Sequence, residues 1–383
     1  MSDEAARSII YMDNAATTRL SEEVLERMTP YLRDDFGNAS AQHSLGRSAA
    51  RAIDEARGRV AEVIHADKGE IYFTSGGTEA DNWAILGTVA SSAAGGHIVT
   101  SQIEHHAVLK ACRHIEAQGI DVTYLKVDGD GFVDPSEVER AIRPDTALIS
   151  VMAANNEIGT LEPIAEVGRI ARARGVPFHT DAVQAFARED IDVNEMRIDY
   201  LSASAHKIYG PKGVGCLYMR RGMALRPFLR GGAQERGRRA GTENVAGIVG
   251  FGWAAEIASA RREDWNARER EARDYMIDRL TGEIPGCVLN GSRRKRLANH
   301  VSVSLAGIES ERLVLMLSDR GVACSSGSAC SSGSQEPSHV LRAIGRLHED
   351  AFSGLRLTLS HSTTMEEAAR VVEAVKRCVE ELR

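Results

Sequence analysis

The sequence lacks long apolar runs and has few cysteines. No run reaches the ~20 apolar residues that a membrane-spanning helix needs. The first residues, MSDEAARSII, begin acidic and do not form the apolar region of a secretion signal. We therefore expect a cytoplasmic protein without a membrane span. No C-x-x-C pair occurs, and the cysteines are too sparse for a disulfide scaffold: Cys112, Cys216, Cys287, Cys324, Cys330 and Cys378.

An excess of positive charge is also absent. The formal net charge is -7, and no basic arm reverses it, which argues against nucleic acid as a partner. Seven of the 47 basic residues are lysines, so each lysine is a candidate for a specific role. Hydrophobic residues make up 43% and charged residues 26%, as in ordinary globular proteins. A chain of 383 residues suggests roughly two domains.

Short apolar segments alternate with helical ones over the first two thirds of the chain. Helices are predicted at 48–64 and at 163–174, the second ending at Gly175. This alternation predicts an α/β fold with a mostly parallel central sheet, whose ligands bind beyond the carboxyl ends of the strands. The predicted strands are 70–75, 97–101, 147–155, 176–181, 199–207 and 213–220.

The pattern changes after about residue 252. A long charged helix is predicted over 254–280, followed by a smaller α+β unit with strands at 300–305 and 354–359. A last helix is predicted to begin at Thr364, because Glu367 three residues later completes a capping box.

Two polar residues follow predicted strands and could act on a cofactor. Lys207, in SASAHKIYGPKG, could form a Schiff base with a carbonyl cofactor, and a surface lysine is the equally good alternative. Asp181, in FHTDAVQA, could pair with a pyridinium nitrogen. Taken alone, the Asp181 motif fits the cap of a following helix better.

A third strand end carries TSGGTEADN, residues 74–82. Gly76, Gly77 and Thr78 would open a helix there, and backbone N–H groups at a helix N-terminus bind phosphate. A plain strand–turn–helix is the alternative, and the dinucleotide and nucleoside triphosphate motifs are absent. In IEHHAV, an imidazole of His105 or His106 could stack on a ring or relay a proton. Adjacent histidines on a helix point in different directions, so no metal site is expected.

Six motifs in order carry a resemblance to a known family. They are YMDNAATT (11–18), TSGGTEADN (74–82), NNEIG (155–159), HTDAVQ (179–184), SAHKIYGPKGVG (204–215) and GGAQERGRRAGTENV (231–245). Together they resemble the cysteine desulfurases of the class V aminotransferase family, and most closely the long-loop type that supplies sulfur for iron–sulfur clusters or nitrogenase. The resemblance implies the pyridoxal-phosphate-dependent transferase fold (aspartate aminotransferase-like, fold type I).

The same resemblance implies two domains and a set of residue roles. Residues 16–258 would form the large cofactor-binding domain, and 1–15 with 259–383 a small domain. Pyridoxal 5'-phosphate would be bound covalently by Lys207, and a homodimer would complete its phosphate site. The other implied roles are Asp181 at the pyridinium nitrogen, His105 stacked on the ring, Asn156 and Gln184 at the phenolic oxygen, Gly77, Thr78, Ser204 and His206 at the phosphate, Thr242 at the partner subunit's phosphate, and Arg356, with Asn156, at the carboxylate of L-cysteine.

The nucleophile implied by the resemblance is Cys330, in SGSACSSG. Its thiolate would attack the sulfur of L-cysteine, forming a persulfide and releasing alanine. The sulfur would then pass to an acceptor protein such as an iron–sulfur scaffold. The Ser/Gly composition of about 324–336 predicts an arm that can reach both places. Cys324 ends a predicted strand, so a buried small residue is favoured there over a resolving thiol.

Two positions depart from the family pattern, and other functions remain open. Ala39 stands where the family usually has Pro, and LSHSTT (359–364) lacks an Arg that commonly follows Leu359-Ser360. One alternative is a selenocysteine lyase or another class V enzyme, although an aminotransferase has no need for a thiol at Cys330. Another is a non-catalytic scaffold for sulfur or clusters, which would have no need for Lys207.

Overall fold

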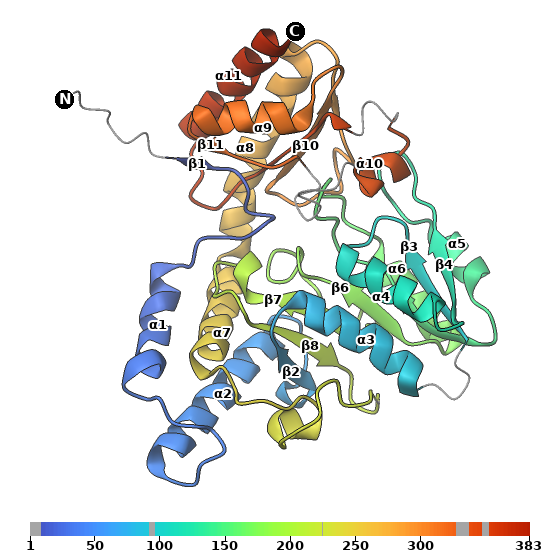
Figure 1. The fold of residues 1–383 in the computed structure, drawn as a ribbon, viewed down its shortest axis with the longest axis vertical. Helices are drawn as coiled ribbons and strands as arrows, with labels where there is room; N and C mark the ends of the chain where they lie inside the picture. The colour runs from blue at the N-terminus through green and yellow to red at the C-terminus, as the bar shows by residue number, and fades with distance from the viewer. Residues whose placement is uncertain (1–8, 92–95, 224, 327–336, 347–351) are drawn as a thin grey trace.

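The chain is described from a computed structural model, which covers residues 9–91, 96–223, 225–326, 337–346 and 352–383 (Figure 1). Cys330 and most of the predicted arm at 324–336 lie outside the described residues. Within the described part, no helix combines the length and apolarity that crossing a membrane requires.

The main sheet has seven strands in the order β2-β8-β7-β6-β5-β3-β4. Neighbouring strands from β7 to β4 are parallel, and β8 runs antiparallel to both β7 and β2, so the predicted α/β fold with a mostly parallel sheet is confirmed. Most of its strands are buried along their whole length, as expected for a sheet covered on both faces. The strands are β2 Ile71–Thr74, β3 His97–Ser101, β4 Asp121–Leu125, β5 Thr146–Ser150, β6 Phe178–Asp181, β7 Tyr200–Ser204 and β8 Gly215–Met219.

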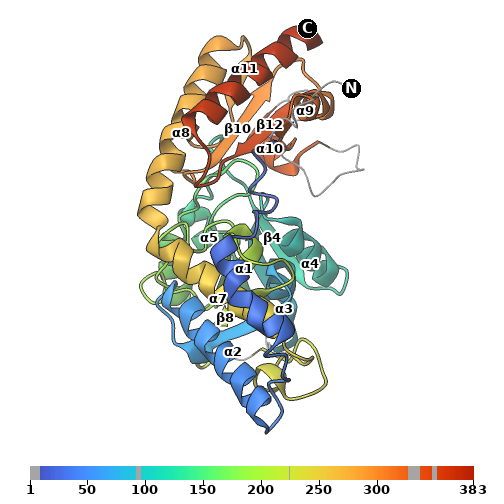
Figure 2. The same ribbon diagram turned by 90° about the vertical axis from the view of Figure 1, so that its left-hand side faces the viewer.

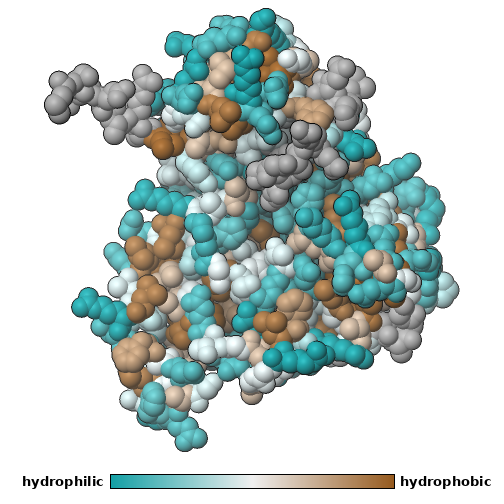
Figure 3. Space-filling model, viewed as in Figure 1, coloured by the Kyte–Doolittle hydropathy of each residue, from teal (hydrophilic) through white to brown (hydrophobic). Residues whose placement is uncertain are grey.

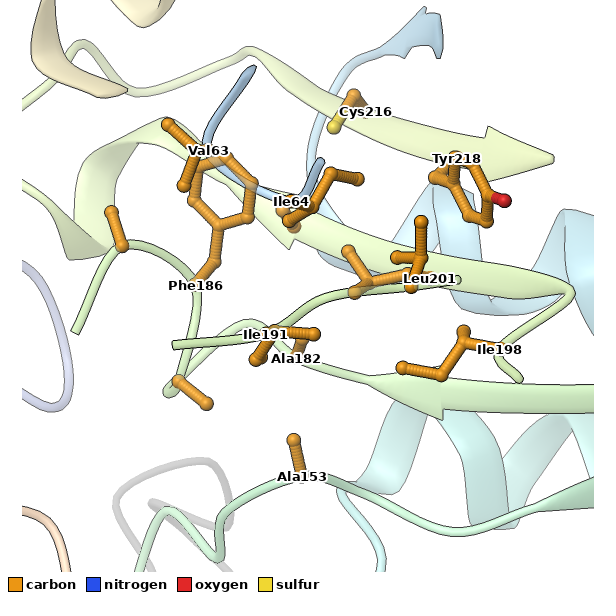
Figure 4. Close-up of a cluster of buried hydrophobic side chains, with 14 of the residues drawn as sticks. Val63, Ile64, Ala153, Ala182, Phe186, Ile191, Ile198, Leu201, Cys216 and Tyr218 are labelled. Carbon is orange, nitrogen blue, oxygen red and sulfur yellow. The ribbon is translucent and has the colours of Figure 1, made fainter. Parts of the chain in front are cut away.

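Alternation along β7 sorts its side chains between the two faces. Leu201 packs into the main apolar cluster with Cys216, Tyr218 and Phe186 (Figure 4). Ser202 and Ser204 have the opposite parity and therefore point to the other face of the sheet. The strand thus contributes apolar contacts to the core on one side and hydroxyl groups to the site on the other.

Helices cover both faces of this sheet. The C-cap Gly175 of α6 has a φ of 68°, which glycine adopts without steric cost, and this confirms the predicted helix end. The helix predicted at 48–64 is α2 and begins earlier, at Ser44. The helices around the sheet are α1 Glu22–Arg33, α2 Ser44–Glu62, α3 Gly77–Ser91, α4 His106–Glu116, α5 Pro135–Ala141, α6 Ile164–Arg174 and α7 Val245–Ala260, with short 3₁₀ turns η1 Lys68–Glu70, η2 Ala205–Lys207 and η3 Gln234–Gly237.

The prediction of a single helix over 254–280 is wrong. The segment is divided between α7, ending at Ala260, and α8, Arg262–Glu283, with Arg261 at φ −104° and ψ 5° between them. The two helices have different environments, because α7 is apolar and packs on α1 and α2, whereas α8 is charged and leads to the second sheet. Figure 2 shows α8 leaving the main sheet toward β10 and α11.

A smaller antiparallel sheet has the order β12-β10-β9. Its strands are β9 Cys287–Leu289, β10 His300–Leu305 and β12 Gly354–Thr358, and it packs with α8, α9 Ser310–Asp319 and α11 Met365–Leu382 around its own apolar cluster. The capping box of Thr364 and Glu367 at the start of α11 is confirmed. Strand β1, Ile10–Tyr11, pairs with β11, Val322–Ala323, and α10 spans His339–Ala343. The domain boundaries at 16–258 and 259–383 stay predictions.

Candidate active site

A cavity of about 300 Å³ lies where β6, η2, α3, α4 and β12 converge. The size is at the lower end of the range for small-molecule sites. Ten of the predicted site residues line it, from segments far apart in the chain: Gly77, Thr78, His105, Asn156, Asp181, Gln184, Ser204, His206, Lys207 and Arg356. The carboxyl-end location expected for a parallel sheet is therefore confirmed.

Lys207 ends the 3₁₀ turn that follows β7. Its Nζ donates to the backbone carbonyl of Ala16 at 2.9 Å and to that of Ala15. Gln184 Nε2 also donates to the Ala15 carbonyl, at 3.0 Å. The turn is held by Gly210 N–H, which donates to the Ala205 carbonyl. The N-terminal segment therefore forms one wall of the cavity and fixes where the amine lies.

Asp181 is the last residue of β6 and is buried. Its Oδ1 accepts the Val183 N–H at 2.9 Å, so it caps a turn and not the helix that the alternative interpretation expected, while its side chain also lines the cavity. Burial raises its pKa, and the Val183 hydrogen bond and the charge of Lys207 oppose that shift. The ionised form of Asp181 is thus stabilised by the Val183 N–H and by the charge of Lys207.

His105 is the N-cap of α4, and its Nδ1 accepts the Ala107 N–H at 3.1 Å. Burial lowers its pKa to about 4, with further lowering by Lys207 and the neighbouring histidines. The ring is therefore neutral at physiological pH and presents Nε2 as its N–H. A neutral imidazole at the cavity wall suits stacking on an aromatic cofactor.

The ring of His106 lies closer to that of His339 than to that of His105. The ring centroids of His106 and His339 are 4.9 Å apart, against 6.4 Å for His105 and His106. His339 Nε2 donates to the Glu104 carbonyl at 3.0 Å. Both His105 and His106 line the cavity, with their ring planes tilted by 53° to each other.

The end of the cavity near α3 has the features of a phosphate site. Gly77 begins α3, and a Cβ added there would overlap Cγ2 of Val183, so glycine permits the close approach of the two turns. His206 contacts Thr17, with 3.2 Å between Nδ1 and Oγ1. Since the first turn of α3 presents backbone N–H groups beside Ser204, this end can bind an anion.

Arg356 projects into the cavity from β12 in the smaller sheet. Its Nη2 lies 2.8 Å from Asp13 Oδ1, and its Nη1 donates to the Asn156 carbonyl at 2.9 Å. Its backbone exchanges two hydrogen bonds with Ser325, at 2.8 and 3.2 Å. The first residues of the predicted sulfur-carrying arm therefore lie beside the strand that carries Arg356.

Two predicted residues are not in the described cavity. Thr242 is exposed and does not line it. Its loop is anchored nearby, because Arg239 pairs with Glu79 of α3 at 2.8 Å. Cys330 lies outside the described residues. Cys324 is half-buried against the small apolar cluster, and burial raises its pKa to about 12, in line with the buried residue favoured from the sequence.

The two departures from the family pattern lie at residues that pack against other parts of the protein. His361, in LSHSTT, stacks on Trp265 with ring centroids 4.2 Å apart, and contacts Tyr209 edge-on at 4.5 Å. Ala39 is partly buried against the main apolar cluster. Neither residue lines the cavity.

Sequence reasoning assigned no role to several buried acids near the cavity. Asp81 belongs to the motif TSGGTEADN and is 1% exposed. Glu157 accepts a hydrogen bond of 2.5 Å from Ser338, and burial raises its pKa to about 7. Because α3 also carries the acid Glu79, an acidic residue on this helix gave no specific signal for Asp81.

Comparison with known proteins places the chain in a family. The family Aminotransferase class-V matches residues 10–371. The chain is 52% identical to a cysteine desulfurase IscS of Methanosarcina thermophila, covering 98% of this chain and 93% of that protein. It is 49% identical to a cysteine desulfurase IscS of Dictyoglomus turgidum, covering 98% and 95%.

Solved structures agree with the sequence comparisons. A NifS-like protein has a TM-score of 0.91 at 34% identity, covering 97% of this chain and 100% of that chain. A structure described as SspA in complex with cysteine has a TM-score of 0.81 at 39% identity, covering 92% and 99%. The likeness to these structures extends over the whole fold, in agreement with the resemblance inferred from the motifs. The chain therefore belongs to the cysteine desulfurases of the class V aminotransferase family, which depend on pyridoxal phosphate.

Proposed function

We propose that this protein is a cysteine desulfurase that takes sulfur from L-cysteine and releases L-alanine. The observation that carries the proposal is the convergence of Lys207, Asp181, His105 and Arg356 on one cavity, in a chain of this family. Each of the four comes from a different segment of the chain, and each offers a different kind of chemical group. An amine, a buried acid, a neutral ring and a guanidinium are the groups that this cofactor and an amino acid substrate need.

The described residues fit pyridoxal phosphate. The cavity holds an amine at Lys207 and a buried acid at Asp181, and the missing Cβ of Gly77 lets the start of α3 pack directly against Val183, beside the cavity. When bound, the cofactor withdraws electrons from the α-carbon of the substrate. We assign Lys207 to the covalent bond and Asp181 to the ring nitrogen. His105 would stack on the ring, Asn156 and Gln184 would hold its phenolic oxygen, and Gly77, Thr78, Ser204 and His206 would hold the phosphate.

Arg356 is assigned to the carboxylate of L-cysteine. A guanidinium can bind a carboxylate with two hydrogen bonds, which sets its orientation. Asn156 would assist through its side chain, because its backbone carbonyl already positions Arg356 Nη1. With the carboxylate held at the β12 side, Lys207 of the same cavity would be placed to take up the α-proton of the substrate.

Cys330 is assigned as the nucleophile. Its thiolate would attack the sulfur of the substrate, so that an S–S bond forms while the C–S bond breaks. The electron pair of the C–S bond would stay on the β-carbon, which takes up a proton before alanine departs. The other cysteines support this choice by their burial, which raises the pKa of every one of them, to about 12 for three: Cys112, Cys287 and Cys324. A thiol needs its thiolate form to attack, and burial of this kind makes a thiol inert.

Partners are proposed from the same family assignment. We propose a homodimer in which Thr242 contributes to the phosphate site of the partner subunit, and an acceptor protein for the sulfur, such as an iron–sulfur scaffold. The exposure of Thr242 supports a role outside its own cavity.

Figure 3 shows apolar side chains gathered over α1 and the segment after it, where Leu25, Leu32 and Phe36 are exposed. Exposed apolar patches of this kind often mark protein interfaces.

The proposal extends to organisation and location. We propose that residues 16–258 form the cofactor-binding domain, that 1–15 and 259–383 form the small domain, and that the protein is cytoplasmic. The separate apolar clusters around the two sheets support the division.

The function is tested by incubating the purified protein with L-cysteine and a thiol reductant, and measuring alanine and sulfide. We expect the two products in equal amounts over many turnovers. A parallel incubation with L-selenocysteine separates the desulfurase from a lyase. Turnover of selenocysteine alone would overturn the proposal, and so would the absence of bound pyridoxal phosphate, which favours a non-catalytic scaffold.

A further inference from the structure

Asp81 is a second acid in the cavity beside Asp181. It lies on α3, one turn after Gly77, and is 1% exposed. The Ser202 hydroxyl hydrogen-bonds its side chain, while its buried Oδ1 has no hydrogen-bond partner among the described residues. A buried carboxylate with an unsatisfied oxygen is costly, so its presence in the cavity wall requires an explanation.

The two acids are too close together to be ionised at the same time. One side-chain atom each from Asp81, Asp181 and His105 lie within 4.8 Å of one another. Burial, and then the charge of Asp181, raises the pKa of Asp81 well above its usual value. Two buried carboxyl groups at this separation share one negative charge, because a second would meet both desolvation and repulsion.

The surroundings decide which acid carries the charge. Asp181 accepts the Val183 N–H and lies near the Lys207 charge, and both favour its ionised form. Asp81 has no such cation. Glu104 is buried at the same site, and its negative charge, when present, further raises the pKa of Asp81. Burial raises the pKa of Glu104 itself to about 8.

His179 lies near Asp81 without being a cation for it. The distance from His179 Nε2 to Asp81 Oδ1 is 3.6 Å. Both ring nitrogens are engaged by hydroxyls, Nε2 with Ser202 at 3.0 Å and Nδ1 with Ser150 at 2.8 Å. Burial lowers the His179 pKa to about 3, so the ring is neutral. His105 is neutral as well, for the same reason.

We propose that Asp81 is a positioning residue that carries the proton of this acid pair, so that Asp181 alone is ionised. The inference rests on the proposed role of Asp181 at the cofactor nitrogen. A neutral Asp81 would leave a single negative charge, on Asp181, for a protonated ring nitrogen to balance. The Ser202 hydroxyl, held by His179, fixes the orientation of Asp81. The buried chain from Ser150 through His179 and Ser202 to Asp81 therefore supports the charge on Asp181.

Infrared spectroscopy of the holoenzyme tests the proposal without activity as the readout. In wild-type protein carrying isotope-labelled aspartate, we expect a neutral-carboxyl band near neutral pH, because Asp81 and Asp181 are the buried aspartates of the described part. The spectrum of the wild type minus that of Asp81→Asn should contain this band. A matched control, Asp190→Asn at an exposed carboxylate, should instead lose ionised-carboxylate bands. Carboxylate bands in the Asp81 difference, or no neutral band in the labelled wild type, would overturn the proposal.

A second readout follows the colour of the bound cofactor with pH. If Asp81 is neutral, Asp81→Asn removes no charge from the site. The midpoint of the absorbance titration should then move by less than about half a pH unit. A shift of more than about one unit would indicate that an ionised Asp81 was lost. Because Asp81, His105 and Asp181 could also hold a metal ion, metal analysis is included, and a bound divalent ion at this site would overturn the proposal. Alanine formation by the wild type is scored separately, so failure here leaves the proposed function intact.

Discussion

Arg356 and Asp13 join the smaller sheet to the N-terminal segment through an ion pair of 2.8 Å at the cavity wall. The guanidinium is 3% exposed, and its other terminal nitrogen donates to the Asn156 carbonyl. A buried arginine held on two sides has a fixed orientation, which is what recognition of a substrate carboxylate requires. Residues 343 positions apart thus prepare one binding site.

Arg356→Lys should raise the KM for L-cysteine by about tenfold or more, which corresponds to about 1.4 kcal/mol. A lysine ammonium cannot make two parallel hydrogen bonds to a carboxylate, and it lacks the planar fork that contacts both Asp13 and Asn156. Steady-state kinetics measure the effect, and the cofactor absorbance should be unchanged. Arg346→Lys, an arginine that donates to Asn290 and Leu289, is the control and should leave KM unchanged. Equal KM values for both variants would contradict the assignment of Arg356.

Lys207→Ala should abolish covalent cofactor binding and turnover. The amine of Lys207 lines the cavity and is held by the Ala15 and Ala16 carbonyls, where it can react with a carbonyl group. Borohydride reduction followed by mass measurement detects the covalent bond. Lys212→Ala, five residues later and exposed, should keep both properties. Covalent cofactor in Lys207→Ala, or its loss in Lys212→Ala, would show that the wrong lysine was assigned.

Gly77→Ala should weaken cofactor binding by about tenfold or more while the protein still folds. The added methyl group overlaps Cγ2 of Val183 and pushes the turn that carries Asp181, at a cost of about 1–3 kcal/mol. Fluorescence titration of apoprotein with pyridoxal phosphate measures the affinity. Adding Val183→Ala removes the overlapping methyl group and should restore most of the binding. Gly69→Ala, where a Cβ meets nothing within 4 Å, is the control. No rescue by Val183→Ala would refute the steric explanation.

Glu162→Gln should make the stability of the protein less sensitive to pH. Burial raises the Glu162 pKa from 4.5 to about 8, and its Oε2 accepts the Val133 N–H at 2.9 Å. A carboxyl group with a raised folded-state pKa contributes fully below about pH 4.5, and its contribution is lost as the pH rises to about 8.

The free energy of unfolding of Glu162→Gln minus that of the wild type should therefore increase between pH 4.5 and 8, by at most about 1.4 kcal/mol per pH unit. Urea unfolding at several pH values measures this difference. Glu137→Gln, at an exposed side chain, should give a flat difference. A flat difference for Glu162→Gln as well would mean that the pKa of this carboxyl group is the same in the folded and the unfolded protein.

Features that depend on local sequence could be predicted. The end of α6 at Gly175 and the start of α11 at Thr364 follow from backbone preferences and side-chain caps. Polar groups at strand ends singled out Lys207, Asp181 and His105, since parallel strands bring those ends to one edge. Other cavity residues, such as Arg356, came from the resemblance alone. The resemblance then supplied the roles that single motifs left open, such as the choice between a surface Lys207 and a cofactor lysine.

Features that depend on long-range packing could not be predicted. The break at Arg261 arises because α7 packs on α1 and α2 whereas α8 packs on the smaller sheet, and both segments have helical patterns. Strand β8 is as fully buried as the parallel strand β7 beside it in the sheet order, so its reversed direction leaves no signal in its own residues. The role of Asp81 depends on its distance from Asp181, a hundred residues later in the chain.

The most direct measurement is the location of the sulfur after reaction with L-cysteine. The protein is incubated with substrate in the absence of reductant, alkylated and analysed by peptide mass spectrometry. The account predicts one additional sulfur on Cys330 in the wild type and in Cys324→Ser, and none in Cys330→Ser, which should keep its bound cofactor. Full alanine formation by Cys330→Ser, or the sulfur found on Cys324, would contradict it.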